Sequence, residues 1–271
     1  MPPQVEALED RCLLSALTTV PSTIDILNPL TVPLDMLVAA QPKGNPNVVV
    51  LGDSIAAGYA YVTGMPVWSA FLAPLGAVDY GVGNQTTQTL LYQLSLGQLV
   101  GINPSAVVLI IGTNNLVEGD SPSATADGVL ADVNAIHHYL PAAEILVLGV
   151  PPLGSRPNDP YRQLADQTDA LVNQMLAGDP RAAFFNIAPS LEQPDGTVSN
   201  FMLLDTIHPT PLGYLDITAF LLVPLEEAWL ESTFRSQVSW VDGLFGEVAL
   251  SFQFGSRASA TVSSGLRALI L

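Results

Sequence analysis

Short runs of aliphatic and β-branched residues recur along the chain from about residue 47 onward. Runs of this length with few polar positions are typical of strands in a parallel sheet that is buried on both faces. We therefore predict five strands, at residues 48–51, 77–80, 106–111, 144–148 and 183–187.

Longer segments between these runs carry apolar residues at the spacing of an amphipathic helix. They are residues 121–140, with a stripe of Val129, Leu130, Val133, Ile136 and Leu140, and residues 160–177, with a stripe of Leu164, Thr168, Leu171, Val172, Met175 and Leu176. The alternation of strands and helices predicts right-handed crossovers and an α/β fold, namely a three-layer α/β/α sandwich with about five parallel strands.

A last helix is predicted to begin at Thr210, whose side chain can cap it, because Pro211 suits the first turn. Pro224 stops the apolar run that follows, so we expect a second helical piece from there to about Phe234. The regular part of the chain, residues 45–234, is predicted to form one domain.

The two ends of the chain differ from this regular part. Residues 1–44 are rich in Pro, Leu and Thr without clear periodicity and form a predicted N-terminal extension. Residues 8–15, Leu-Glu-Asp-Arg-Cys-Leu-Leu-Ser, are similar to a short N-terminal motif of exported proteins of certain bacteria, although acidic residues stand where a secretory signal would be basic. A targeting segment and an unstructured start are equal alternatives, which leaves export, a cell-envelope location and a cytoplasmic location all open.

Residues 235–271 form a predicted C-terminal extension. A strand is predicted there from the alternation with smaller or polar residues of Val248, Leu250, Phe252 and Phe254. This strand either belongs to a β-hairpin that packs on the domain or begins a further region.

Composition narrows the partners of the protein. The 271 residues include 8 basic and 25 acidic residues, for a net charge of −17, and Lys43 is the only lysine. Because phosphate contacts need clusters of Lys and Arg, we predict no nucleic-acid binding and no attraction to anionic membranes. No uncharged apolar run approaches the roughly 18 residues of a membrane span, so no transmembrane segment is expected. A single cysteine, Cys12, allows no internal disulfide and no thiolate metal cluster.

Polar motifs stand at the ends of the predicted strands. Gly52-Asp53-Ser54 follows the first strand, Gly83-Asn84 follows the second, Gly112-Thr113-Asn114-Asn115 follows the third, and Asp205-Thr206-Ile207-His208 precedes the last helix. In an open parallel sheet, ligands bind beyond the carboxyl ends of the strands. We therefore expect these four motifs to meet at one edge of the sheet.

The residue types in these motifs are the ones that an acyl-transfer hydrolase requires. Ser54 is the candidate nucleophile, His208 the candidate base, and Asp205 the candidate residue that orients the imidazole. The other two histidines, His137 and His138, lie on the helix predicted for residues 121–140 and are interpreted as bystanders.

An oxyanion hole is predicted from the backbone N–H of Ser54, the backbone N–H of Gly83 or Asn84, and the side-chain amide of Asn114. Asn115 is interpreted as a turn former rather than as a further donor, since Asn suits turns. The loop of residues 151–160 follows the fourth strand and is interpreted as a lining of the substrate site.

Neither a metal nor a cofactor is predicted. A zinc site needs three or four ligands, and the sequence has no His-Glu-x-x-His motif and no pair of cysteines. Lys43 does not stand in a P-loop, and the Gly-x-Ser-x-Gly motif of ordinary α/β-hydrolases is absent.

Together, these motifs resemble those of the SGNH (GDSL-type) hydrolases, closest to the group of platelet-activating-factor acetylhydrolase catalytic subunits. The similarity rests on the blocks Gly52-Asp53-Ser54, Asp79-Tyr80-Gly81-Val82-Gly83-Asn84-Gln85-Thr86-Thr87, Gly112-Thr113-Asn114-Asn115, Asp195-Gly196-Thr197-Val198-Ser199 and Asp205-Thr206-Ile207-His208. It covers about residues 45–223 and implies a flavodoxin-like fold, a Ser-His-Asp acyl-enzyme mechanism and a small ester substrate with a short acyl group, acetyl being a candidate. Two departures are Ile55 in place of the Leu in the motif name and Asn84 in place of the second-block glycine, where a backbone donor is retained.

Two other functions remain open at this point. A catalytically silent SGNH-like binding module of a cell-surface protein would have the same fold. A flavodoxin-like nucleotide or flavin binder would also share it, but the sequence lacks a phosphate-binding glycine loop. The sequence predicts no particular oligomeric state.

Overall fold

The computed structural model describes residues 44–245, 253–254 and 258–259. Five parallel strands form one sheet in the order β2-β1-β3-β4-β5. Their bounds are β1 Val48–Gly52, β2 Ala77–Asp79, β3 Ala106–Ile110, β4 Glu144–Leu148 and β5 Ala182–Phe185. The predicted five-stranded parallel sheet is thus confirmed, with every boundary within two residues of its predicted position.

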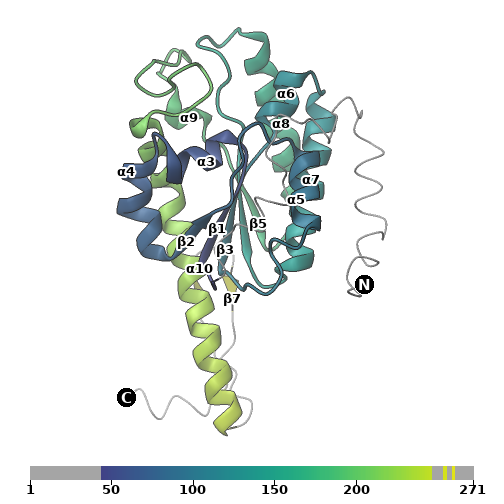
Figure 1. The fold of residues 1–271 in the computed structure, drawn as a ribbon, viewed down its shortest axis with the longest axis vertical. Coiled ribbons are helices and arrows are strands. Elements are labelled where there is room, and N and C mark those ends of the chain that lie inside the picture. The colour runs from purple at the N-terminus through teal and green to yellow at the C-terminus, as the bar shows by residue number, and fades with distance from the viewer. Residues whose placement is uncertain (1–43, 246–252, 255–257, 260–271) are drawn as a thin grey trace. The chain divides into compact units, whose positions relative to one another are not determined.

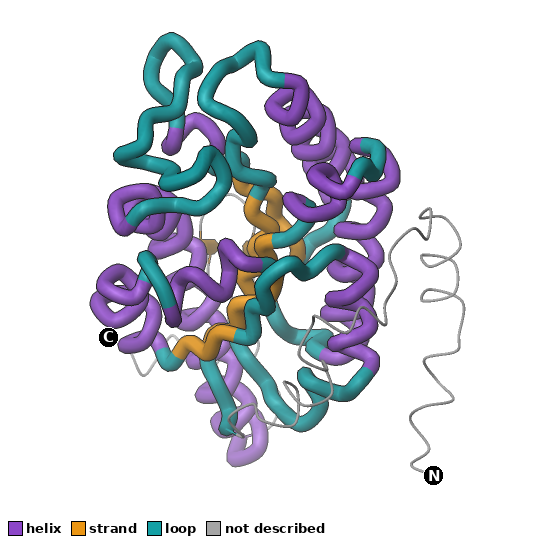
Figure 2. The backbone as a smooth tube through the Cα atoms, turned by 45° about the horizontal axis from the view of Figure 1, so that its top comes forward, coloured by secondary structure: helices purple, strands orange, loops and turns teal. Residues whose placement is uncertain are grey.

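Helices cover both faces of the sheet (Figure 1). One face carries α5 (Thr87–Ser95), α7 (Pro122–Tyr139) and α8 (Pro160–Leu176), and the other carries α3 (Ser54–Tyr61), α4 (Met65–Val67) and the beginning of α10 (Pro211–Phe245). In Figure 2 the strands accordingly lie at the centre of the molecule with helices around them. The three-layer α/β/α architecture is therefore confirmed.

Alternating residues of the strands build the core, because successive strand side chains point to opposite faces. The layer under α5, α7 and α8 contains the following buried residues: Val49, Leu51, Val107, Leu109, Ile145, Val147, Leu90, Leu94, Val129, Val133, Ile136, Val172 and Leu176. The helical stripes predicted for 121–140 and 160–177 supply the last five of them, so those stripes face the sheet.

Shorter elements connect these layers. They are the π-helical turn Trp68–Leu72, the 3₁₀ turn Ala73–Leu75, α6 (Thr113–Glu118) and α9 (Ala188–Leu191). The side chains of Asp53, Thr86, Ser121 and Asp159 accept a hydrogen bond from a backbone N–H in the first turn of α3, α5, α7 and α8, respectively. Such caps satisfy N–H groups that a helix start leaves free.

Helix α10 begins as predicted but continues further than predicted. Thr210 Oγ1 accepts from Gly213 N at 3.1 Å, which is the expected N-cap. The prediction of a separate helical piece after Pro224 was wrong, since α10 is one helix from Pro211 to Phe245. A proline removes one hydrogen bond of the helical ladder, and the remaining bonds maintain α10.

The chain divides into two compact units, Met1–Leu222 and Val223–Leu271. In the second unit, β6 (Gln253–Phe254) pairs antiparallel with β7 (Ala258–Ser259). The predicted strand of residues 248–254 is described only at its last two residues, and the possible targeting motif of residues 8–15 lies outside the described residues. The proposed domain boundaries at residues 44 and 234 stay predictions.

Candidate active site

The candidate site lies where the strand order changes direction. From β1 the chain moves outward to β2, and β3 returns to the other side of β1 before β4 and β5 follow. At such a switch point the loops after two neighbouring strands separate and leave room for a ligand. Ser54 begins α3 directly after β1, and Thr113 begins α6 directly after β3.

Three of the predicted residues form a continuous chain of short contacts. Ser54 Oγ lies 2.9 Å from Nε2 of His208, and Nδ1 of His208 lies 2.8 Å from Oδ2 of Asp205. A carboxylate can only accept, so Nδ1 carries the proton in this arrangement and Nε2 is left as an acceptor toward Ser54. The geometry of a serine–histidine–aspartate triad is therefore present.

The loop that carries Asp205 and His208 is held by its own backbone. Asp205 Oδ1 accepts from His208 N at 2.8 Å and from Ile207 N at 3.2 Å, and Thr206 between them has a φ of 69°. Burial alone would raise the pKa of Asp205, but the hydrogen bonds from the backbone and ring of His208 and from Ile207 lower it overall. Asp205 thus remains charged beside the imidazole.

A glycine is required where β1 meets β3. Gly52 has a φ of 137°, and a Cβ at this position would stand 1.7 Å from the carbonyl oxygen of Ile110. The next residue, Asp53, donates its N–H to that same carbonyl at 3.0 Å. This close approach fixes the point from which Ser54 departs.

Asp53 is fully buried behind Ser54. Its Oδ1 accepts from Ile55 N at 2.9 Å and thereby caps α3. Burial raises the pKa of Asp53 to about 7, although the Ile55 N–H, the charge of His208 and the Thr113 side chain each lower it. Asp53 is therefore a carboxyl group that stays protonated over much of the acidic range.

The structure also brings together the loops predicted to form the oxyanion hole. Asn114 Nδ2 donates to the carbonyl oxygen of Gln85 at 2.8 Å, which joins the loop after β3 to the loop after β2. Asn84 has a φ of 60°, a conformation that Gly favours and that Asn tolerates better than most residues. Asn84 therefore adopts the left-handed conformation that a glycine would favour at this position, and Gly83 precedes it.

The prediction that Asn115 forms a turn was wrong. Gly112, with a φ of 116°, makes the turn after β3, so Asn115 falls inside α6. Its side chain is fully buried and bonds to Thr87, Gln88 and Asp120. No local sequence signal marks the contacts with Thr87 and Gln88, which lie 28 and 27 residues away.

Tyr214 is a further residue of the site that the sequence did not single out. It lies six residues after His208, is buried, and donates its hydroxyl to the carbonyl oxygen of Ile55 at 2.8 Å. A buried tyrosine in an apolar helical stripe needs a partner for its hydroxyl, and that rule was the available signal. Tyr214 connects the helix after His208 to the helix that begins at Ser54.

Arg162 joins two loops at the same edge of the sheet. Its guanidinium is almost fully buried and pairs with the carboxylate of Glu192. It also donates to the carbonyl oxygens of Gly154 at 3.0 Å and Gly196 at 3.3 Å. One buried cation thus holds the loop after β4 against the loop that follows α9.

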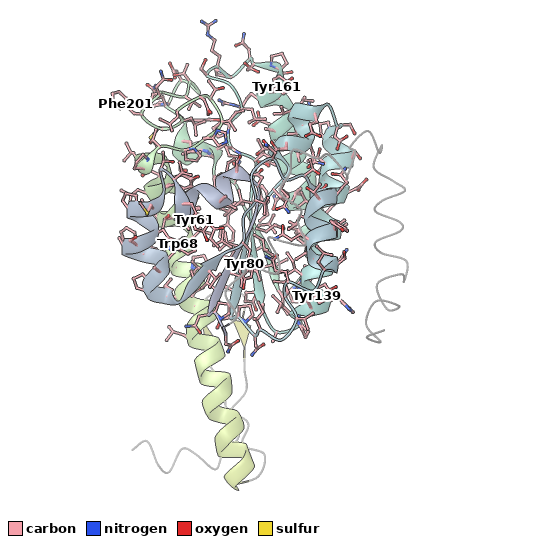
Figure 3. The ribbon with its side chains drawn as sticks, viewed as in Figure 1. Tyr61, Trp68, Tyr80, Tyr139, Tyr161 and Phe201 are labelled. Carbon is pink, nitrogen blue, oxygen red and sulfur yellow. The ribbon has the colours of Figure 1, made fainter. Side chains whose placement is uncertain are left out.

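The loop of residues 151–160 also reaches the triad segment. Gly154 N donates to Thr206 O at 3.3 Å, and Ser155 O accepts from Val198 N at 3.1 Å. Tyr161 and Phe201 are exposed and lie at this end of the molecule (Figure 3). The loop therefore lies beside the candidate site, and a substrate-lining role stays a prediction.

The other two histidines lie elsewhere. His137 Nε2 is 2.9 Å from Asp179 Oδ2, and Tyr139, near the end of the same helix, lies at the end of the sheet opposite Tyr161 and Phe201 (Figure 3). Within residues 44–245, 253–254 and 258–259, no group of three His, Cys, Asp or Glu side chains could hold a metal ion. In the same part of the chain, no helix has the length and apolarity of a membrane span.

Comparison with known proteins shows the family of this chain. The GDSL-like lipase/acylhydrolase family model matches residues 50–215, more than half of the chain. The human platelet-activating factor acetylhydrolase IB subunit alpha1 is 35% identical over 180 residues, which cover 66% of this chain and 75% of that protein. The alpha2 subunit of Gallus gallus is 31% identical over 172 residues, covering 64% and 72% respectively.

A solved structure agrees in fold. A GDSL-like lipase from Bacteroides thetaiotaomicron matches with a TM-score of 0.52 and 19% identity, covering 71% of this chain and 95% of that one. The fold and the family match together define a hydrolase of the SGNH type with a flavodoxin-like α/β fold. The chain belongs to the GDSL-like lipase/acylhydrolase family and is a carboxylic ester hydrolase. The alternative of a catalytically silent binding module is not favoured.

Proposed function

We propose that this protein hydrolyses a small ester with a short acyl group through a Ser54 acyl-enzyme. The observation that carries the proposal is the unbroken contact chain from Ser54 Oγ through the His208 ring to the Asp205 carboxylate. A serine is a weak nucleophile unless a base removes its proton, and this chain supplies that base together with the group that orients it.

In the first half of the reaction, Ser54 Oγ attacks the ester carbonyl carbon and His208 Nε2 takes the hydroxyl proton. The tetrahedral intermediate collapses when the bond to the alcohol oxygen breaks, and His208 returns the proton to that oxygen. Water then attacks the acyl-enzyme with His208 again as base, which releases the acid and restores the Ser54 hydroxyl. Asp205 stabilises the imidazolium that forms in each half.

The oxyanion is assigned to three donors: the N–H of Ser54, the N–H of Gly83 or Asn84, and the Asn114 side-chain amide. One Asn114 proton is used by Gln85 O at 2.8 Å, and a carboxamide has a second proton to donate. The Asn114 amide is thus oriented before substrate binds, which is the condition under which such a donor accelerates the reaction.

The acyl group is proposed to be acetyl. This part of the proposal rests on the relatives at 31–35% identity, whose names specify an acetylhydrolase. The loop of residues 151–160, held by Arg162, is proposed to line the side of the site next to His208. A carbohydrate hydroxyl, a lysophospholipid and a small alcohol are the candidates for the leaving group.

The decisive experiment compares p-nitrophenyl acetate, butyrate and octanoate as substrates of the wild type and of Ser54→Ala. We expect the highest kcat/KM with acetate and a loss of roughly 10⁴-fold or more in the variant. Ser95→Ala is the matched control, because Ser95 is half-buried, as Ser54 is, and its hydroxyl donates locally to Tyr92 O. Labelling by a fluorophosphonate should require Ser54, and equal labelling of wild type and variant would refute the assignment of the nucleophile.

Acetylated oligosaccharide and an acetylated lysophospholipid, measured with the same enzyme, then separate the candidates for the leaving group. A preference for octanoate over acetate would reject the short acyl group while leaving the Ser54 mechanism intact.

A further inference from the structure

Asn115 is the neighbour of Asn114, a proposed oxyanion donor, but its side chain bonds to different residues. Asn114 and Asn115 are consecutive residues of α6, and consecutive helical residues project about 100° apart. Asn114 donates to Gln85 O at 2.8 Å, whereas Asn115 is fully buried and bonds to Thr87. The start of α6 therefore contacts the loop after β2 at two points, two residues apart.

The Asn115 carboxamide is fully satisfied by these neighbours. Its Oδ1 accepts from Thr87 N at 3.0 Å, and its Nδ2 lies 3.0–3.1 Å from Thr87 Oγ1, Gln88 Oε1 and Asp120 Oδ2. Thr87 is the first residue of α5, where a helix leaves N–H groups without partners. Asn115 thus satisfies a free N–H at the start of α5 from a different helix.

The loop between β2 and α5 depends on such hydrogen bonds for its position. A Cβ added at Gly83 would meet no atom within 4 Å, so Gly83 itself makes no close side-chain contact. Backbone hydrogen bonds hold the residues beside it, from Val82 N to Gly52 O at 2.9 Å and from Gln85 N to Val82 O at 3.3 Å. Gln93 bonds to the loop on both sides of Gly83 and Asn84, since its Nε2 donates to Tyr80 O at 3.2 Å and its Oε1 accepts from Gln85 Nε2. Asn115 holds the later end at Thr87.

We propose that Asn115 is a positioning residue for the oxyanion hole. Its buried carboxamide sets the N–H of Gly83 or Asn84 at a fixed place relative to the Asn114 side-chain amide. The inference rests on the proposed function, because it assigns Asn115 to the donors that the function requires. Loss of this carboxamide leaves the backbone N–H and the Asn114 amide present, but the distance between them is no longer fixed. Small errors in the position of a donor reduce the rate strongly.

The test is a double-mutant cycle on kcat with p-nitrophenyl acetate. Asn115→Ala should lower kcat by about 10- to 100-fold, with KM changed less than about threefold. Combined with Asn114→Ala, the same substitution should lower kcat by less than about threefold, because the distance between the two donors no longer matters once the Asn114 amide is absent. A purely structural role predicts instead that the two losses multiply, and that result would overturn the inference.

A milder pair of variants keeps the test valid if Asn115→Ala folds poorly. Thr87→Val removes one partner of Asn115, and Thr168→Val removes an equally buried hydroxyl that bonds only within α8, to Leu164 O. Thr87→Val should lower kcat by about 3- to 10-fold, while Thr168→Val should leave it within about twofold. Equal losses in the two variants would overturn the inference.

The proposed function fails in a different way. An active Ser54→Ala variant would reject the nucleophile and with it the proposed function. An Asn114→Ala variant with unchanged kcat would reject the oxyanion assignment, and either result would also reject the inference. A slow Asn114→Ala variant with fully multiplying losses in the cycle would reject the role of Asn115 alone.

Discussion

Asp53→Asn is the substitution that tests the electrostatics behind the nucleophile. Asp53 Oδ1 caps α3 by accepting from Ile55 N at 2.9 Å, and Asn retains this acceptor. Oδ2 is buried next to the Thr113 side chain, and it would be replaced by an NH₂ group that can donate to that side chain. The variant therefore retains the cap and removes one ionisable group.

The sign of the effect follows from the raised pKa of Asp53. Its pKa rises from 3.8 to about 7 because burial disfavours the charged carboxylate. Between these two values the unfolded chain has lost the proton while the folded chain retains it, so the free energy of unfolding falls as pH rises. A shift of about three pKa units at about 1.4 kcal/mol each gives a loss of about 4 kcal/mol, complete near pH 7.

Chemical denaturation at a series of pH values measures this difference. Near pH 4 the variant and the wild type should have similar free energies of unfolding, and at pH 8 Asp53→Asn should be more stable by up to about 4 kcal/mol with an unchanged m-value. Turnover at neutral pH should be retained, because the cap of α3 persists. Asp127→Asn on the exposed face of α7 is the control and should show no such trend.

A stability difference between Asp53→Asn and wild type that does not change with pH would refute the reasoning. A variant that becomes relatively less stable as pH rises would refute it more strongly, because that trend belongs to a carboxylate whose charge the fold stabilises.

Three further predictions concern residues around the site. Activity should fall on the acid side of the pH–rate profile, since protonated His208 cannot accept a proton. His208→Ala should be inactive. Replacement of both His137 and His138 by Gln should leave kcat/KM within about threefold. Tyr214→Phe should lower the free energy of unfolding by about 1 kcal/mol in denaturant titrations, because the buried hydrogen bond from its hydroxyl to the Ile55 carbonyl oxygen is lost. Arg162→Met should raise KM for p-nitrophenyl acetate by a larger factor than it lowers kcat, because Arg162 holds the loop of residues 151–160, which is proposed to line the site. An unchanged KM would show that this loop does not contribute to substrate binding.

Much of the fold was predictable because each sheet strand is a short apolar run buried on both faces. The same reasoning located the site, since Ser54 and Asn114 follow neighbouring strands at the point where the strand order reverses. One local rule failed at Pro224, where α10 continues. Another failed at Asn115, because Gly112 makes the turn and Asn115 is therefore helical.

Contacts between distant loops were beyond the reach of sequence patterns. Arg162 bonds to Gly196, 34 residues away, and Tyr214 bonds to Ile55, 159 residues away. Neither bond leaves a periodicity or a spacing in the sequence, because both depend on how segments return to the same edge of the sheet. The triad segment was an exception, since Asp205 and His208 are three residues apart and form their contact locally.

Buried carboxyl groups recur at the edge of the sheet where the candidate site lies. Asp53 accepts from Ile55 N after β1, Asp79 accepts from Gly81 N after β2, and Asp169 accepts from Val150 N after β4. Burial raises the pKa of each to about 7. Each carboxyl therefore supports a loop at this edge in its neutral form. Its contribution to the free energy of unfolding is lost as pH rises from about 4 to about 7, because the unfolded chain ionises first. The loops that carry the nucleophile and its neighbours are thus expected to be most stable below neutral pH.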